Sequence, residues 1–278
     1  MKKVLFVGLG SIGQKHLNNL QKCGTFSIDA LRSQKKFFNG IETVYTSYEE
    51  VPDDYDIIFI TNPTNLHYEA ISKLSNKTKN MFIEKPIYHV VKNIIPINGV
   101  CHVACPLRYS NVVKELQMYV KAHNVFAFRA ICSSYLPDWR KMNYRNCYSS
   151  KSELGGGVEL DLIHEIDYLK WIFGKFDNIK RISAKKSNLE INSNDYTSYL
   201  LENKKYVGSV HLDYFGRQTK REIEVFSEFE TKVFDITKTK NDIYLDEMKY
   251  FLEAVEIGNK NCYNTPDEAI ESLKAALV

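Results

Sequence analysis

The sequence predicts an α/β protein: a doubly wound parallel sheet, followed by an α+β domain with a largely antiparallel open sheet. Up to about residue 105, short apolar runs alternate with segments of helical spacing. Three glycines follow the first apolar run, and alternating apolar and polar residues fill much of the later chain. At 278 residues, 44% of them hydrophobic, the chain can form two cores. We therefore expect a Rossmann-type domain over residues 1–106 and a second domain over residues 107–278.

In the first half, the apolar runs are short and continuous, as in parallel strands that are buried on both faces. We expect strands within residues 3–8, 27–32, 55–61, 80–86 and 98–105, and helices over residues 11–23 and around 67–74. Strands separated by helices in this order predict a parallel sheet.

The second half is predicted to begin with a helix up to about residue 123 and a strand over 126–134. A polar aromatic loop then leads to one helix from the glycine run 155–157 to about residue 173. Alternating segments follow at 178–186, 195–203, 205–215, 221–229 and 232–236, and helices at 246–257 and from 266 onward. Successive alternating strands with short polar turns predict an antiparallel sheet with one face in water.

The charge balance argues against nucleic-acid and membrane partners. Lys and Arg total 37 against 34 Asp and Glu, and the net charge of +3 is spread along the chain. No apolar run approaches the ~20 residues that span a bilayer. The run after Met1 is broken at Gly8 and Gly10 and lacks a signal-peptide cleavage site. We expect a cytoplasmic protein.

The six cysteines form no C-x-x-C pair and have no histidine at zinc-ligand spacing. Cys101 and Cys105 lie in VCHVAC, which alternates like a strand, so buried free thiols are expected. We predict no disulfides and no metal.

A Gly-x-Gly-x-x-Gly run follows the first predicted strand directly and opens a helix: Gly8, Gly10, Ser11, Ile12 and Gly13 are its candidate cofactor contacts. In this context, the first glycine permits a tight turn, the second lets the backbone approach a pyrophosphate, and the third lets the helix pack on the strand. The alternative is a glycine-rich loop that merely turns the chain. The order of strand, loop, helix and second strand favours a dinucleotide site.

The end of the second strand bears on the choice of nicotinamide cofactor. An acid there would bind the ribose 2′-hydroxyl of NAD. Instead, Arg32 and Ser33 stand about 20 residues after the glycine run, with Lys35 and Lys36 beyond, which suits a 2′-phosphate. NADP is favoured over NAD. A solvated basic loop is one alternative, and Asp29 as the acid, with a displaced strand, is another.

Two polar elements could manage a proton. Lys85 in Glu84-Lys85-Pro86 follows a predicted strand, at the sheet edge where ligands collect. Asp161 and His164 are three apart and are predicted to share one helix face, where a carboxylate can orient a titratable imidazole. A plain surface lysine and a helix with satisfied polar side chains are the alternatives.

These pieces together resemble the glucose-fructose oxidoreductase, inositol dehydrogenase and MocA (Gfo/Idh/MocA) family of NAD(P)-dependent oxidoreductases. The matching segments are GLGSIG at 8–13, TNPTNLH at 61–67, EKP at 84–86, LRY at 107–109 and GGGVELDLIHEIDYL at 155–169. The resemblance implies a second domain whose open sheet forms the substrate wall and an oligomer interface, here of a dimer or tetramer. At 278 residues the chain is short for the family, so a trimmed second domain or final helix is expected.

The resemblance also implies residue roles. Lys85 would contact substrate and assist proton transfer, His164 would be the general acid/base, and Asp161 the nearby acid. Further cofactor contacts would come from Thr61, Asn62, Pro63, His67, Glu84 and Lys85. The family usually spaces acid and histidine four apart. The spacing of three here turns Asp161 by roughly 100° about a helix, which makes its role less secure than that of His164.

The loop over residues 135–150 mixes aromatic and cationic side chains that can stack on sugar rings and bind hydroxyls or a carboxylate. The candidate substrate contacts are Arg108, Trp139, Arg140, Tyr144, Arg145, Tyr148, Asp161 and His164. A loop that only packs is the alternative. The segments YLPDWR, NYR and HLDYFGR resemble those of a subgroup of this family. Proteins of that subgroup are linked with the biosynthesis of bacterial surface sugars, including nonulosonic acids.

The leading hypothesis is hydride transfer between a nicotinamide and a hydroxyl or keto carbon of a small sugar-type substrate. One alternative is a regulator that binds NADP without catalysis, against which Lys85 and His164 argue. Another is a reductase of the same fold that acts on a non-sugar.

Overall fold

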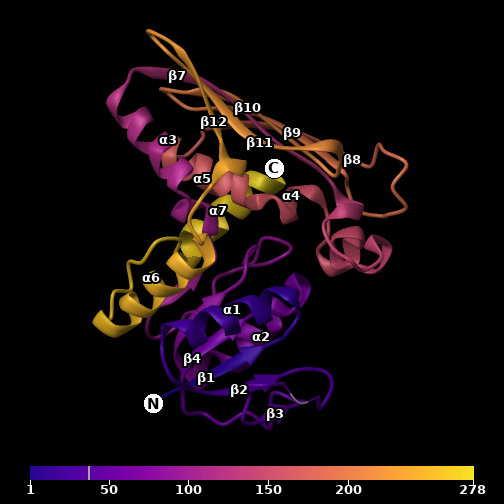
Figure 1. Cartoon of the computed structure of the whole chain (residues 1–278), viewed down its shortest axis with the longest axis vertical. Coiled ribbons are helices and arrows are strands. Elements are labelled where there is room, and N and C mark those ends of the chain that lie inside the picture. Colours follow the sequence, from indigo (N-terminus) through magenta and orange to yellow (C-terminus); the bar gives the residue numbers. More distant parts are fainter. Residues whose placement is uncertain (37) are drawn as a thin grey trace. The chain divides into compact units, whose positions relative to one another are not determined.

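The computed structural model describes residues 1–36 and 38–278 (Figure 1). They form two compact units, one of Met1–Cys105 with Asp242–Ile270 and the other of Pro106–Asn241 with Glu271–Val278. The segment Asp242–Ile270, which sequence analysis placed in the second domain, packs with the first unit. Its helix α6 (Ile243–Ile257) buries Met248 and Phe251 in that unit's core.

The first unit contains a six-stranded sheet in the order β3-β2-β1-β4-β5-β6, with every neighbouring pair parallel. The strands are β1 (Lys2–Val7), β2 (Phe26–Leu31), β3 (Val44–Tyr45), β4 (Tyr55–Ile60), β5 (Thr78–Ile83) and β6 (Cys101–Val103). The predicted parallel sheet is confirmed, with the short edge strand β3 added. Its order reverses between β1 and β4, and ligands of such sheets bind at the carboxyl ends beside that point.

Two further helices of this unit, α1 (Ser11–Cys23) and α2 (His67–Leu74), begin and end where the sequence predicted. Apolar residues at helical spacing, such as Leu17 and Leu20 of α1, are buried in the core. The rings of Phe6 and Phe59 stack there at 4.6 Å between centroids. Short 3-10 turns cover Thr64–Leu66 and Ser75–Lys77.

The second unit holds a six-stranded sheet in the order β12-β11-β7-β10-β9-β8. Its strands are β7 (Val125–Tyr135), β8 (Asn178–Ala184), β9 (Tyr196–Glu202), β10 (Val207–Asp213), β11 (Phe215–Ser227) and β12 (Thr231–Asp235). Only β7 and β10 pair in parallel, so the predicted, largely antiparallel sheet is confirmed. The long connections after β7 allow that one parallel pair.

Helices α3 (Asn111–Ala122), α4 (Val158–Asp161) and α5 (Ile163–Phe173) lie on one side of this sheet (Figure 1). The strands alternate accordingly: Tyr199 and Leu201 are fully buried, whereas Leu200 between them is 59% exposed. Helix α7 (Pro266–Leu277) contributes its residues from 271 onward to this unit. Short 3-10 turns cover Pro106–Tyr109, Leu136–Asp138, Tyr144–Asn146, Tyr148–Ser150, Ser152–Leu154 and Ile236–Lys238.

The six cysteines are free thiols, and five of them are buried, as predicted. None of the helices formed by the described residues combines the length and apolar character needed to cross a membrane.

Candidate functional site

The glycine loop between β1 and α1 has the geometry of a phosphate cradle. Gly8 has φ +87°, and a Cβ there would lie 2.8 Å from the Asn62 Cα. A Cβ on Gly13 would lie 2.6 Å from the Gly8 carbonyl oxygen, whereas a Cβ on Gly10 would meet open space. No side chain caps α1, so the amides from Ser11 and Ile12 onward can face a ligand. Each glycine therefore serves a different requirement of a dinucleotide loop.

The segment after β4 supports this loop. Thr61 donates its hydroxyl to the Gly8 carbonyl oxygen at 2.6 Å and its backbone N–H to Val7 at 2.9 Å. The Asn62 Oδ1 is buried and has no hydrogen-bond partner within the described part of the chain. Pro63 is exposed. Thr61 thus fixes the loop, and the buried Asn62 Oδ1 beside it is an unsatisfied acceptor within the described part of the chain.

Arg32 directly follows β2, and its guanidinium lies 4.4 Å from the centre of the Phe38 ring. The Arg32 Nε and Nη1 atoms are buried without a hydrogen-bond partner among residues 1–36 and 38–278. Ser33 beside it is exposed. Asp29, by contrast, lies within β2 and accepts a hydrogen bond from the Tyr55 hydroxyl at 2.6 Å. Asp29 is therefore occupied in the strand, and Arg32 is the polar group at the strand end.

Glu84 and Lys85 follow β5 at the carboxyl edge of the sheet. The buried Glu84 carboxylate accepts a hydrogen bond from the His16 Nε2 at 2.5 Å and one from the Lys85 backbone N–H at 3.1 Å. Burial raises the pKa of Glu84, but the bond from His16 and the nearby charges outweigh it and hold this pKa below its usual range. Glu84 thus anchors the Lys85 backbone to α1.

His67 is buried and joins two of the predicted segments. Its Nε2 lies 2.9 Å from the Asn62 carbonyl oxygen, and its Nδ1 lies 3.1 Å from that of Pro86. Burial lowers the pKa of His67, which favours the neutral ring. The ring therefore braces the segment after β4 against the segment after β5.

The single helix predicted over 155–173 is wrong: the structure has two helices, α4 and α5, with a break at Leu162. Leu162 has φ −97° and ψ 21°, which takes it out of helical geometry. Asp161 ends α4 and His164 lies in α5, so the two do not share one helix face. A spacing argument assumes an unbroken helix, and the break removes that assumption.

The two side chains accordingly have different partners. Asp161 is buried and accepts a hydrogen bond from the Tyr214 hydroxyl at 2.6 Å. His164 Nε2 accepts one from the Arg221 Nη2 at 2.7 Å, and Arg221 Nε lies 2.9 Å from the buried Glu165 carboxylate. Burial raises the pKa of Glu165, but Arg221 and His164 lower it more. His164 therefore belongs to a group with Arg221 and Glu165.

Sequence reasoning missed Arg221, although a signal existed. Arg221, Ile223 and Val225 alternate along β11, and the latter two are fully buried. Period-2 alternation places Arg221 on the same, helix-covered face. A cation at such a position needs an acidic partner, which Glu165 supplies.

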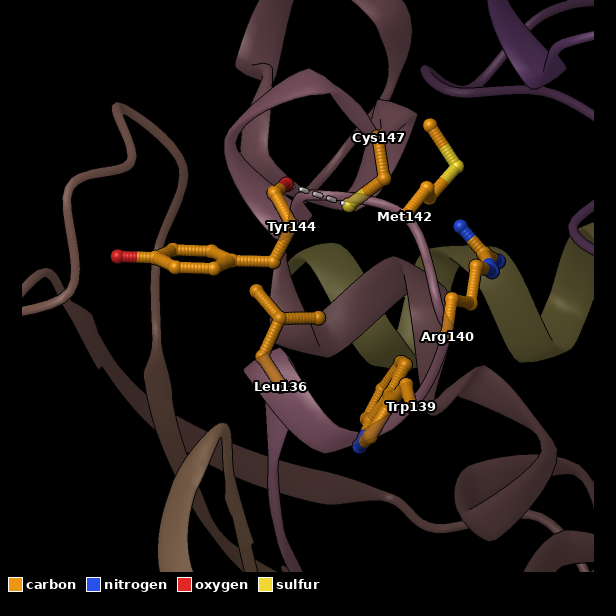
Figure 2. Close-up of a pocket in the computed structure, with 6 residues that line it drawn as sticks. All are labelled: Leu136, Trp139, Arg140, Met142, Tyr144 and Cys147. Atoms are coloured by element: carbon orange, nitrogen blue, oxygen red, sulfur yellow. Dashed lines mark hydrogen bonds between the residues drawn. The ribbon is translucent and has the colours of Figure 1, made fainter.

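In the aromatic loop, three of the candidate residues line one small hollow (Figure 2). Trp139, Arg140 and Tyr144 surround it together with Leu136, Met142 and Cys147. The space is large enough for one water molecule at most. Arg140 also lies 5.3 Å from the centre of the Tyr148 ring.

Two other candidates are engaged elsewhere. Arg145 pairs with Glu190 at the surface. Arg108 is buried and donates two hydrogen bonds to Asp167, at 2.9 Å and 2.7 Å. Neither joins the hollow between Trp139 and Tyr144.

Residues 2–95 match the oxidoreductase family with an NAD-binding Rossmann fold, Gfo/Idh/MocA. Over this range, the chain is similar to that family. Over 90 residues it is 31% identical to an uncharacterized oxidoreductase, YrbE, of Bacillus subtilis. That stretch covers 29% of this chain and 26% of the relative's length.

Solved structures are similar over almost the whole chain. A probable dehydrogenase from Thermotoga maritima has a TM-score of 0.82 at 18% identity, with 99% of this chain and 94% of that chain covered. The WlbA dehydrogenase from Bordetella pertussis, in complex with NADH and UDP-GlcNAcA, has a TM-score of 0.81 at 13% identity, with 99% and 96% covered. At these identities the similarity establishes the fold of both units.

Proposed function

We propose that the protein is an NAD(P)-dependent oxidoreductase that transfers a hydride between the nicotinamide and a hydroxyl or keto carbon of a sugar-type substrate. The observation that carries this proposal is the cradle of Gly8, Gly10 and Gly13, which leaves open space where a pyrophosphate would approach. Two unsatisfied polar groups also support dinucleotide binding. The Asn62 Oδ1 after β4 can accept a hydrogen bond from the cofactor, and the Arg32 Nε and Nη1 atoms after β2 can donate hydrogen bonds to it.

NADP is the proposed cofactor. The Arg32 guanidinium can donate paired hydrogen bonds to a 2′-phosphate, and its stacking on Phe38 orients it. The acid that would select NAD is missing from this strand end because Asp29 is bound to Tyr55 within β2.

Lys85 and His164 are the proposed proton-transfer residues. In the oxidative direction, the carbinol carbon loses a hydride, the hydroxyl loses a proton, and a keto group forms. NADP⁺ held by the glycine loop and Arg32 would supply the hydride acceptor. Lys85, fixed by Glu84, would bind the hydroxyl oxygen. The His164 imidazole would accept the proton at Nε2, which requires that Arg221 release this nitrogen when substrate binds. Asp161, which accepts a hydrogen bond from Tyr214, would contribute to the wall of the substrate site and would not orient His164.

A sugar-type substrate is supported by the residue types of the loop: Trp139 and Tyr148 have rings that could stack on a sugar, and Arg140, beside the Tyr148 ring, could bind an acidic group. The structurally similar protein from Bordetella pertussis was solved in complex with NADH and UDP-GlcNAcA. We propose a hexose derivative with a carboxylate or phosphate as the first class to test, and an assembly of two or four copies through the open sheet.

The test begins with fluorescence titrations of NADPH and NADH. Turnover is then measured with UDP-hexosamines, UDP-hexuronates, sugar acids and inositols. Lys85→Ala and His164→Ala should each lower turnover at least about 100-fold while NADPH still binds. Lys79→Ala on β5 and His123→Ala, both exposed, are matched controls that should keep full activity. Full activity in Lys85→Ala would refute the proposed role, and tight binding without turnover across the panel would favour a regulator.

A further inference from the structure

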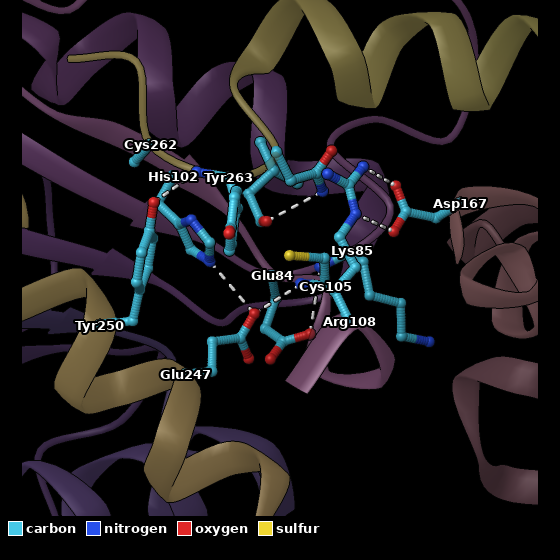
Figure 3. Close-up of polar contacts among 12 residues, drawn as sticks. Glu84, Lys85, His102, Cys105, Arg108, Asp167, Glu247, Tyr250, Cys262 and Tyr263 are labelled. Atoms are coloured by element: carbon cyan, nitrogen blue, oxygen red, sulfur yellow. Dashed lines mark hydrogen bonds and ion pairs between the residues drawn. The ribbon is translucent and has the colours of Figure 1, made fainter. Parts of the chain in front are cut away.

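Three buried side chains of different chemistry converge in the first unit, outside the residues proposed for catalysis. His102 lies on β6, Cys105 follows two residues after that strand, and Glu247 lies on α6. One ligand atom from each residue lies within 4.8 Å of the other two. Figure 3 shows the His102 ring, the Cys105 sulfur and the Glu247 carboxylate turned toward one another.

The donor types match those that bind zinc: an imidazole nitrogen, a thiolate sulfur and a carboxylate oxygen. The His102 Nε2 lies 3.1 Å from the Glu247 Oε1. Two ligands at ~2.0 Å from a tetrahedral zinc ion are ~3.3 Å apart, so this spacing already approximates one edge of a zinc site. A direct hydrogen bond between these two atoms would have the same length. The second carboxylate oxygen of Glu247 distinguishes a metal site from a simple hydrogen bond.

That oxygen is the Glu247 Oε2, which is buried without a hydrogen-bond partner among the described residues. The other oxygen, Oε1, accepts a hydrogen bond from the Cys105 backbone N–H at 2.6 Å. The centre of the His102 ring lies 5.2 Å from that of Phe82 and 6.0 Å from that of Phe251, so the surroundings are apolar. A carboxylate with one unsatisfied oxygen is costly in such surroundings, and a cation bound to it removes that cost.

We propose that His102, Cys105 and Glu247 bind a structural zinc ion, with both Glu247 oxygens completing a four-atom donor set. Binding requires the thiolate, so the Cys105 proton, and any proton on His102 Nε2, are released to solvent. The ion would tie α6 to β6 and so fix a late segment of the chain to the parallel sheet. The sequence alone did not predict this metal site, because Glu247 lies 145 positions after His102.

The test uses the untagged full-length chain, purified with zinc and dialysed, with metal content measured by inductively coupled plasma mass spectrometry. Wild-type protein should retain one zinc ion per chain. Cys105→Ser and Glu247→Gln should lose it. Cys147→Ser is the matched control, because that buried thiol donates to the Tyr144 carbonyl oxygen, lies in the other unit and should not affect zinc.

A second measurement does not depend on how the variants fold. Co²⁺ added to the metal-free wild type should produce a thiolate-to-metal charge-transfer absorption, and zinc should abolish it by displacement. Wild-type protein without retained zinc and without this absorption would overturn the proposal, as would equal zinc in folded Cys105→Ser. Neither result would affect the proposed oxidoreductase activity, because none of the three residues belongs to its machinery.

Discussion

The Arg221 Nη2 donates a hydrogen bond to the His164 Nε2 across 2.7 Å, although the two residues lie 57 positions apart. A guanidinium has no acceptor, so the imidazole must accept at Nε2. A neutral His164 then carries its proton on Nδ1. The same guanidinium binds the buried Glu165 carboxylate at 2.9 Å, which fixes its own position.

Arg221→Met should therefore change both the imidazole and the fold. Glu165 would be left buried without its cation, which should lower the free energy of unfolding by about 3 kcal/mol. Released His164 should populate the Nε2–H tautomer, seen by nitrogen-15 NMR of histidine-labelled protein and assigned with His164→Asn. Arg217→Met, at an exposed arginine of β11, should change neither. An unchanged tautomer in folded Arg221→Met would contradict this interpretation.

The glycine loop gives two substitutions with opposite outcomes. Gly10→Ala meets no atom within 4 Å, so the free energy of unfolding should change little while dinucleotide binding weakens at least about tenfold, since the methyl occupies the pyrophosphate approach. Gly13→Ala would press on the Gly8 carbonyl oxygen and the Thr61 hydroxyl, and should cost about 1–3 kcal/mol of stability. Urea denaturation and NADPH titration of both variants separate the two effects. Equal binding by Gly10→Ala and wild type would place the pyrophosphate elsewhere.

Arg32→Ala should weaken NADPH binding about 10-fold to 100-fold, the range expected when a charge-assisted hydrogen bond to phosphate is lost. NADH binding should change far less, because NADH lacks the 2′-phosphate. The ratio of the two dissociation constants is the measurement. Lys36→Ala, at an exposed neighbouring cation, is the control for general charge. A proportional loss of both cofactors would assign Arg32 to the adenine or ribose instead.

The sequence predicted most strands and helices of residues 1–105 closely, because local signals there coincide with the tertiary structure. The glycine run and the period of Leu17 and Leu20 specify both ends of α1. The packing of Asp242–Ile270 on the first unit lay beyond such signals, since it depends on contacts such as the Phe251 ring against Phe59. Contacts between segments far apart in the chain produce no periodic pattern in the sequence.

The candidate site was predicted less well where a side chain's partner lies on another element. Asp161 and His164 were paired by spacing, yet Asp161 contacts Tyr214 on the segment after β10, and His164 contacts Arg221 on β11. The break at Leu162 could not be foreseen, because leucine is a good helix former. Such errors arise where tertiary contacts override local propensity.

Asp195 links stability to pH in the second unit. Its buried carboxylate accepts hydrogen bonds from the Lys186 and Ser187 backbone N–H groups at 2.6 Å and 3.0 Å, and from the Ser187 hydroxyl at 2.5 Å. Burial raises the pKa of Asp195, but these bonds outweigh it and hold the pKa below its usual range. A depressed folded-state pKa means that the ionised form stabilises the fold. This contribution is complete above the unfolded pKa of about 3.9 and is lost as pH falls through the folded value.

Asp195→Asn should accordingly lower the free energy of unfolding by about 1–3 kcal/mol at neutral pH, because an amide NH₂ replaces one of two accepting oxygens. The difference from wild type should shrink as the pH falls below about 4, where Asp195 of the unfolded chain takes up its proton, and should vanish once the pH has passed the lower pKa of the folded state. Urea denaturation at several pH values measures it. Asp177→Asn, at an exposed aspartate before β8, is the control and should remain close to wild type throughout. A destabilisation by Asp195→Asn that stays constant with pH would mean that shape, and not charge, matters at this position.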